Sequence, residues 1–215
     1  MSVFPKTPIL DSGAGANEDP IAVNWSGPIF SGIAQLRRVS NQIAPNASAF
    51  GGSYIDLSQY GPDCEAYATI AALQAIDTID GYLYVRAQNV GTTSLDGYIV
   101  MLFRSSGVND DGLQLAVETD GADTALGFSG GFDWAVGDKY GIRANKNRIE
   151  AWRCPAGGSW TRLISAVDST YASAGYIGLA AEASSLRLTD IGGGTAQLYP
   201  FVSDQDSASA ITATA

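Results

Sequence analysis

The sequence contains no histidine among its 215 residues. This absence excludes serine–histidine and cysteine–histidine catalysis, histidine zinc sites and every acid–base mechanism that uses an imidazole. Only two cysteines are present, Cys64 and Cys154, and they lack the close spacing of zinc or thioredoxin-like sites. They are either two small buried thiols or a disulfide that closes a loop of about 90 residues.

Positive charge is also scarce, with 12 Lys plus Arg against 22 Asp plus Glu, a net charge of −10 and a sequence pI of about 4.2. Such a surface repels phosphate backbones and anionic lipid, so nucleic acid is not an expected partner. The longest apolar run, Tyr98 to Phe103, has the length of a strand and not the roughly 20 residues that cross a bilayer. We therefore expect no membrane insertion. The first residues lack the apolar core of a signal peptide, so we expect synthesis without export.

Short apolar runs, by contrast, are frequent, and Gly, Asn, Asp or Ser separates them about every 10 residues. This rhythm predicts an all-β fold, a two-sheet antiparallel jelly-roll sandwich. The predicted strands are Gln35–Val39, Ser53–Leu57, Glu65–Leu73, Tyr82–Asn89, Gly97–Ser105, Gly112–Glu118, Thr124–Phe128, Lys139–Ala144, Arg148–Cys154, Trp160–Val167, Gly175–Ala181 and Leu186–Ile191.

One segment, Glu65 to Ala75 (EAYATIAALQA), is also compatible with a helix because it is rich in alanine. Its apolar residues do not follow a helical period, and Tyr67, Thr69 and Ile70 favour extended structure. We therefore predict a strand there.

The two ends of the chain differ from the middle in composition. Residues 1–24 are rich in Gly, Pro, Asn and Asp and predict an extended N-terminal arm, while residues 25–202 form the sandwich. Residues 203–215 (SDQDSASAITATA) are small and polar and predict a flexible C-terminal tail. If the protein is part of a particle, we expect both ends to become ordered when they bind a neighbouring molecule.

The segment Asn147–Leu179 resembles the concanavalin A-like lectin/glucanase superfamily, including laminin-G-like domains. The matching positions are Trp152, Trp160, Asp168, Tyr171 and the strand Gly175–Leu179. Further matches to members found in bacteriophage particles and bacterial surface proteins are Ala16–Pro20, Asn24–Trp25 and Val39–Gln42. The resemblance implies the sandwich fold; it leaves function open, because lectins, hydrolases and inert structural modules share this fold.

Glycoside hydrolysis, the enzymatic alternative, needs two carboxyl groups about 5 to 9 Å apart. No Glu-x-Asp-x-Glu triplet is present, and we expect the isolated glutamates to be solvated, with folding still able to bring Glu118 or Glu150 near an aspartate. These glutamates are Glu18, Glu65, Glu118, Glu150 and Glu182. The sequence therefore predicts no catalytic residue and a protein that is not an enzyme.

Calcium is a further alternative, because hard oxygen ligands gather around one predicted hairpin. These residues are Asn109, Asp110, Asp111, Asp120 and Asp123. Acidic turns are common in a chain of this charge, and the spacing matches no EF-hand. We predict neither a metal site nor a cofactor, with Ca²⁺ as the alternative.

A sugar-binding face is predicted from two neighbouring strands. Period-2 alternation would place Tyr82, Tyr84 and Arg86 on one face of their strand, and Tyr98 and Arg104 on one face of the next. If the strands pair, these residues would form the floor of a groove to which Trp152 adds a ring. The other interpretation is that both faces are half-buried and that each arginine pairs with a carboxylate.

A role in a virus-like particle would explain several features of this acidic β-protein together. These features are the absence of an export signal, the absence of an active site and the flexible ends. We therefore predict a structural or adhesive component of a phage-like virion, a capsid decoration or tail-associated protein assembled in the host cytoplasm. Its partners would be other virion proteins, copies of itself or a host-surface glycan. The alternatives are a lectin-like carbohydrate-binding module, with an extracellular location, and a glycoside hydrolase.

Overall fold

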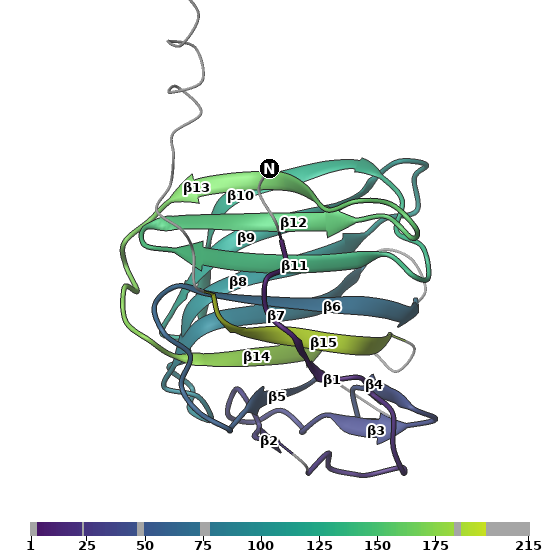
Figure 1. Cartoon of the computed structure of the whole chain (residues 1–215), viewed down its shortest axis with the longest axis vertical. Coiled ribbons are helices and arrows are strands. Elements are labelled where there is room, and N and C mark those ends of the chain that lie inside the picture. The colour runs from purple at the N-terminus through teal and green to yellow at the C-terminus, as the bar shows by residue number, and fades with distance from the viewer. Residues whose placement is uncertain (1–3, 23, 47–49, 74–77, 183–185, 197–215) are drawn as a thin grey trace, which may run out of the picture.

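Two antiparallel β-sheets face each other across a shared apolar core (Figure 1). The structure is a computed structural model that describes residues 4–22, 24–46, 50–73, 78–182 and 186–196. The predicted flexible tail at residues 203–215 lies outside the described residues. Among the described residues, no helix is long and apolar enough to cross a membrane.

Sheet A has eight strands, of which β1 (Ile9–Asp11) pairs with β15 beside the main path. The main path runs in the order β13 (Thr161–Val167), β12 (Arg148–Cys154), β11 (Lys139–Asn145), β6 (Cys64–Ala72), β15 (Arg187–Thr195), β4 (Gln42–Ala44) and β3 (Arg37–Val39). The seven strands of sheet B run in the order β10 (Ala122–Phe132), β9 (Asp111–Thr119), β8 (Asp96–Arg104), β7 (Thr78–Gln88), β14 (Tyr176–Ala181), β5 (Gly51–Ile55) and β2 (Trp25–Ser26).

The all-β, two-sheet sandwich predicted from the sequence is confirmed, and each predicted strand overlaps an observed one. The segment with a helical alternative forms β6, so the strand prediction is correct up to Ala72, whereas residues 74 and 75 lie outside the described residues. The short strands β1, β2 and β4 were not predicted. Each has only two or three residues, too few to show an alternating pattern.

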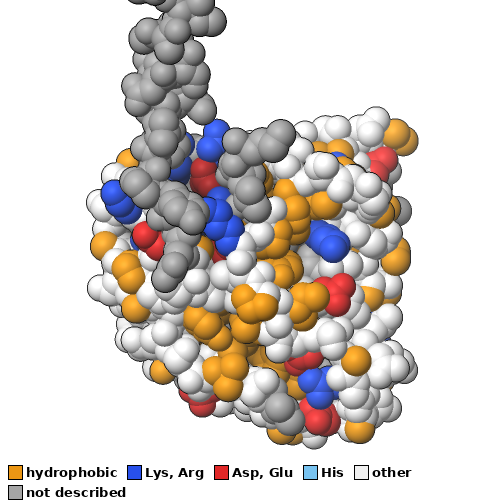
Figure 2. All heavy atoms as spheres, in the orientation of Figure 1, with side chains coloured by type: hydrophobic (Ala, Val, Ile, Leu, Met, Phe, Trp, Pro, Cys, Tyr) orange, Lys and Arg blue, Asp and Glu red, His pale blue; other side chains and the backbone are white. Residues whose placement is uncertain are grey.

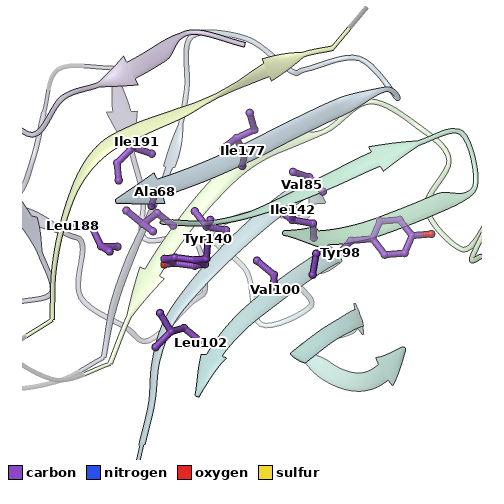
Figure 3. Close-up of a cluster of buried hydrophobic side chains, with 14 of the residues drawn as sticks. Ala68, Val85, Tyr98, Val100, Leu102, Tyr140, Ile142, Ile177, Leu188 and Ile191 are labelled. Atoms are coloured by element: carbon purple, nitrogen blue, oxygen red, sulfur yellow. The ribbon is translucent and has the colours of Figure 1, made fainter. Parts of the chain in front are cut away.

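The core between the sheets is built from side chains that alternate along each strand. On β8, Tyr98, Val100 and Leu102 point into this core, where Tyr140 and Ile142 of β11 meet them (Figure 3). Strand geometry sends every second side chain to the other face, and on β8 these are apolar as well. An apolar outer face needs its own cover, and the chain supplies one for each sheet.

The N-terminal segment covers the outer face of sheet A. It descends across β12, β11 and β6 to β1, which pairs with β15 (Figure 1). Figure 2 looks onto this face and shows hydrophobic side chains gathered along its middle, over the path of the segment. On sheet B, Ile29, Phe30 and Ile33 pack against the outer face instead.

Both cysteines are free and buried. Their partners on β11 are Ala144 for Cys64 and Lys139 for Cys154, five residues apart along one strand. At about 3.3 Å per residue this separation is about 16 Å, far beyond the reach of a disulfide. The structure therefore supports the interpretation that the two cysteines are buried thiols and not a disulfide.

Candidate functional site

Tyr82 and Tyr84 lie on the outer face of sheet B, as part of the predicted sugar-binding face. Tyr82 is half-buried, packs edge-on against Phe50 at 5.2 Å between ring centroids, and donates a hydrogen bond to Glu182 Oε2 at 3.1 Å. Tyr84 is only 4% exposed. Burial, together with the neighbouring carboxyl of Glu118, raises the pKa of Tyr84 well above its ordinary value.

Arg86 does not share this face, so that part of the prediction is wrong. Val85 is opposite Tyr98 and Gln88 is opposite Asp96, which leaves two residues of β7 opposite Gly97. This β-bulge, with Arg86 at φ +53°, turns the side chain toward the core. Arg86 is fully buried.

The Arg86 guanidinium donates hydrogen bonds to three backbone carbonyls, those of Pro62 (2.6 Å), Tyr171 (2.7 Å) and Lys146 (2.6 Å). It holds three loops together, and no surface is left for a sugar.

The remaining three predicted residues are also separated. Tyr98 lies inside the sandwich and donates to Asp168 Oδ1 at 2.7 Å. Arg104 follows Tyr98 in the alternation, at the opposite end of β8, with its Nε 3.7 Å from Asp111 Oδ2. Trp152 lies on the other sheet and is 3% exposed. The predicted groove formed by all six residues is therefore wrong, although β7 and β8 do pair.

Trp152 is buried because the N-terminal segment covers it. Phe4 stacks on its ring with centroids 5.0 Å apart and an interplanar angle of 3°. The Phe4 ring also meets Tyr67 and Trp160 edge-on, and the Arg143 guanidinium lies 4.8 Å from its centroid. This aromatic cluster fixes the segment to sheet A.

Three glutamates expected in solvent are buried, so that expectation is wrong for them: Glu65 is 0%, Glu150 5% and Glu118 6% exposed. Glu65 pairs with Arg143 at 2.8 Å and accepts hydrogen bonds from the backbone of Lys6 and Thr7. Glu150 pairs with Arg162 at 2.8 Å. Glu65 and Glu150 are therefore paired within sheet A, whereas Glu118 has no cationic partner among the described residues.

Glu118 belongs to a group of acidic side chains at one end of β8, β9 and β10. We call this group, which consists of Asp96, Glu118, Asp120 and Asp123, the acidic corner. Asp120 and Gly121 form the turn between β9 and β10, with φ +52° and +73°, as a two-residue hairpin turn of this kind requires. The turn places Asp123 directly opposite Glu118. The dipeptide Asp120-Gly121, which is typical of a two-residue hairpin turn, indicates this register in the sequence.

Asp96 organises the loops around the corner. Its Oδ1 accepts hydrogen bonds from the backbone N–H of Asp120 at 2.9 Å and from Tyr171 Oη at 2.8 Å. Its Oδ2 accepts from Asn89 Nδ2 at 2.8 Å. The Asp96 carboxylate thus positions the corner, whereas Asp123 is exposed to solvent and Glu118, directly opposite it, is buried.

The chemistry of the corner is set by Glu118. Its Oε2 has no hydrogen-bond partner in the part of the chain that the structure describes, and its carboxyl receives a hydrogen bond from Tyr84. The pKa of Glu118 is raised to about 7, chiefly by burial; the charges of Asp123 and Asp96 also raise this pKa, and the hydrogen bond from Tyr84 lowers it. Partial burial also raises the pKa of Asp123.

An aromatic ring packs against the turn of the same hairpin. A Cβ added to Gly121 would come within 2.9 Å of the Phe30 ring, and Phe30 forms a parallel bridge with Thr92. Phe30 is half-buried. The corner therefore has carboxylate acceptors, which bind hydroxyl or amino donors. The Phe30 ring near its turn can pack against apolar C–H groups.

The acidic residues considered as calcium ligands do not form one cluster among the described residues. Asp110 and Asp111 lie at the start of β9, whereas Asp120 and Asp123 lie at its other end, where Asp123 is opposite Glu118. Glu118 is seven residues along β9 from Asp111, about 24 Å at about 3.4 Å each. Asp111 is also already bound by the backbone N–H groups of Ser105 and Trp134. In the part of the chain that the structure describes, no three His, Cys, Asp or Glu side chains come close enough to hold a metal ion.

Solved structures with the same architecture include carbohydrate-binding proteins. The exoplasmic/lumenal domain of VIP36, in a form described as Ca²⁺/Man2-bound, superposes with a TM-score of 0.64 at 12% identity, covering 94% of this chain and 91% of that one. The chain has a concanavalin A-like lectin fold. No protein-family profile and no curated sequence matches it.

Two further structures bear on this fold. A legume lectin-like domain from Entamoeba histolytica aligns with a TM-score of 0.51 at 12% identity, over 80% of this chain and 90% of that one. The GH43 protein BlXynB from Bacillus licheniformis aligns with a TM-score of 0.55 at 8% identity, over 86% of this chain but 38% of that one. At these identities the likeness establishes the fold alone.

Proposed function

We propose that this protein is a carbohydrate-binding, lectin-like module whose glycan contacts the acidic corner and the Phe30 ring. The observation that carries the proposal is the Glu118–Asp123 pair, which has no cationic partner among the described residues and belongs to the hairpin whose turn packs against the Phe30 ring. Sugar hydroxyls donate to carboxylate oxygens, and the apolar face of a pyranose packs against aromatic rings. The fold shared with VIP36, whose structures are described as bound to mannose-containing ligands, supports the proposal.

A glycan array with the full chain identifies ligands, and calorimetry then measures the best one against variants. We expect Asp123→Asn and Phe30→Ala each to weaken binding by about tenfold or more, equivalent to about 1.4 kcal/mol. Asp110→Asn is the matched control, because this exposed aspartate lies next to the opposite end of β9. Binding that both corner variants retain would contradict the proposed site.

The sequence-based residue Tyr82 gives a second comparison on the same face. It lies farther along β7 from the corner than Tyr84. We expect Tyr82→Ala to leave affinity within about twofold of the parent, because a corner-bound sugar need not reach it. A large loss of affinity for Tyr82→Ala, with no loss for Asp123→Asn, would show that the glycan contacts sheet B near Tyr82 and not at the acidic corner.

Glycoside hydrolysis is a second candidate, favoured by the proximity of Glu118 and Asp123 on paired strands. A carboxyl with its pKa near 7 beside another carboxyl is suited to general acid catalysis. Release of reducing ends from array ligands, abolished by Glu118→Gln, would support an enzyme. Binding without release supports the lectin-like module.

The role in a phage-like virion stays a prediction from the sequence. The solved structures compared above are lectin-like domains and a GH43 protein, and they supply no virion partner. A virion location, with an extracellular one as its alternative, is likewise a prediction. Detection of the protein in purified particles by mass spectrometry would support it, and its absence from particles made by cells that express it would contradict it.

A further inference from the structure

We infer that the acidic corner selects glycans that carry a free, unacetylated amino group. The inference rests on the proposed function and narrows its ligand class. It starts from the charge of the site. Within the described residues, none of the four carboxylates of the corner takes part in an ion pair, although arginines elsewhere form six such contacts.

The buried side chain of Glu118 shows that the corner is incomplete. Its Oε2 accepts no hydrogen bond from any described residue, and Glu118 is 6% exposed. A buried acceptor without a donor costs about 1 to 3 kcal/mol, and more when it is charged. A neutral sugar hydroxyl would donate to this oxygen but would not stabilise the ionised form of the carboxyl. An ammonium group does both.

The geometry favours an ammonium group over a metal ion. Calcium takes six to eight oxygen ligands, and within the described residues no three acidic side chains, those of the corner included, are placed so that they could hold a metal ion. An ammonium group needs fewer acceptors, because it has only three N–H donors on one nitrogen atom. Asp123 is exposed and directly opposite Glu118, so an amine bound by Asp123 also lies beside the Glu118 carboxyl.

The surroundings favour an amino sugar over an isolated amine. The half-buried Phe30 ring packs near Gly121, between the hairpin and the loop at Thr92. A pyranose lying on this ring could place a ring substituent over the carboxyls. Acidic sugars such as uronates would be repelled, because the corner offers no positive charge to them.

Binding of an ammonium group should also displace a proton. Burial and the neighbouring carboxylates raise the pKa of Glu118 to about 7, so this group is largely protonated in the free protein at about pH 6.5. A cation beside it favours the carboxylate, and the proton then leaves for the buffer. A neutral glycan would have no such effect.

The test uses two probes with the same backbone, a β-1,4-linked glucosamine tetramer and its fully N-acetylated counterpart. Calorimetry of the full chain at about pH 6.5, in two buffers of different ionisation enthalpy, gives affinity and proton release together. We expect the free amine to bind about tenfold or more tightly, with release of part of a proton. Asp123→Asn should remove the preference and Glu118→Gln the proton release. Asp110→Asn should change neither, and thermal unfolding checks that each variant is folded.

Equal affinity for the two tetramers overturns the inference and leaves the proposed function standing. So does array binding, at the corner, of neutral glycans alone. A lysine-rich peptide that binds as tightly and loses affinity with Asp123→Asn would also overturn it, by identifying a protein amine as the ligand. If no glycan on the array binds, the proposed function itself fails.

Discussion

Replacing Glu118 with glutamine should make the protein more stable at alkaline pH. The side chain keeps its shape and its Tyr84 contact but loses an ionisable group whose pKa burial raises from 4.5 to about 7. Each pKa unit corresponds to about 1.4 kcal/mol, so this shift in pKa changes the free energy of unfolding by about 3 kcal/mol at most.

The sign follows from which state holds the proton. Below about pH 4 the carboxyl is protonated in the folded and unfolded chains alike, and Glu118 adds no pH dependence. Between 4.5 and about 7 the folded chain binds the proton more tightly, so the free energy of unfolding falls as pH rises. Above that range the free energy of unfolding of the parent is lower by up to about 3 kcal/mol, whereas that of Glu118→Gln is not lowered in this way.

Thermal unfolding of the two proteins between pH 4 and pH 8 measures this difference. For a chain of this size about 3 kcal/mol is about 6 to 12 °C in Tm. We expect similar Tm values at pH 4 and a higher Tm for Glu118→Gln at pH 8, with Asp110→Asn following the parent throughout. Parallel curves for Glu118→Gln and the parent would refute the claim that this carboxyl lacks a compensating partner.

Three other substitutions or reactions test the fold. Arg86→Met should lower the free energy of unfolding in urea by about 3 to 6 kcal/mol, because three backbone carbonyls lose their donor; a loss below 1 kcal/mol would contradict the clamp. Phe4→Ala should cost about 3 kcal/mol and make the N-terminal segment sensitive to protease, with Phe4→Leu milder; unchanged proteolysis would show that the stack on Trp152 does not hold the segment. Burial raises the pKa of Cys64 to about 12, so iodoacetamide should label it at pH 8 only after unfolding; rapid labelling of the folded protein would contradict this.

The strands were predictable from the sequence because their residues are extended-favouring and turn residues separate them. Which face of a strand points inward was not. On β8 the side chains that point inward, Tyr98, Val100 and Leu102, are apolar, and so are their neighbours that point outward. Both faces are apolar because each sheet is covered on its outer side too. A period of two without a polar face does not indicate which side is the core.

The candidate site was only partly predictable. The bulge at Arg86 occupies a positive φ that usually calls for glycine, so an arginine there carries no local signal. Trp152 is covered by Phe4, which is distant in sequence, and no local pattern records such a contact. The Glu118–Asp123 pair was accessible, because the Asp120-Gly121 turn fixes the register, but burial of Glu118 depends on packing across several strands.

The most direct test of the central claim is to map the bound glycan on the protein by NMR. Backbone amide shifts are measured as the best array ligand is added to the full chain. The account predicts the largest changes at Phe30, Gly97 and residues 118–123, with little change at Tyr67 or Trp152 on sheet A. Changes confined to sheet A, or to the end of β9 near Asp111, would contradict it.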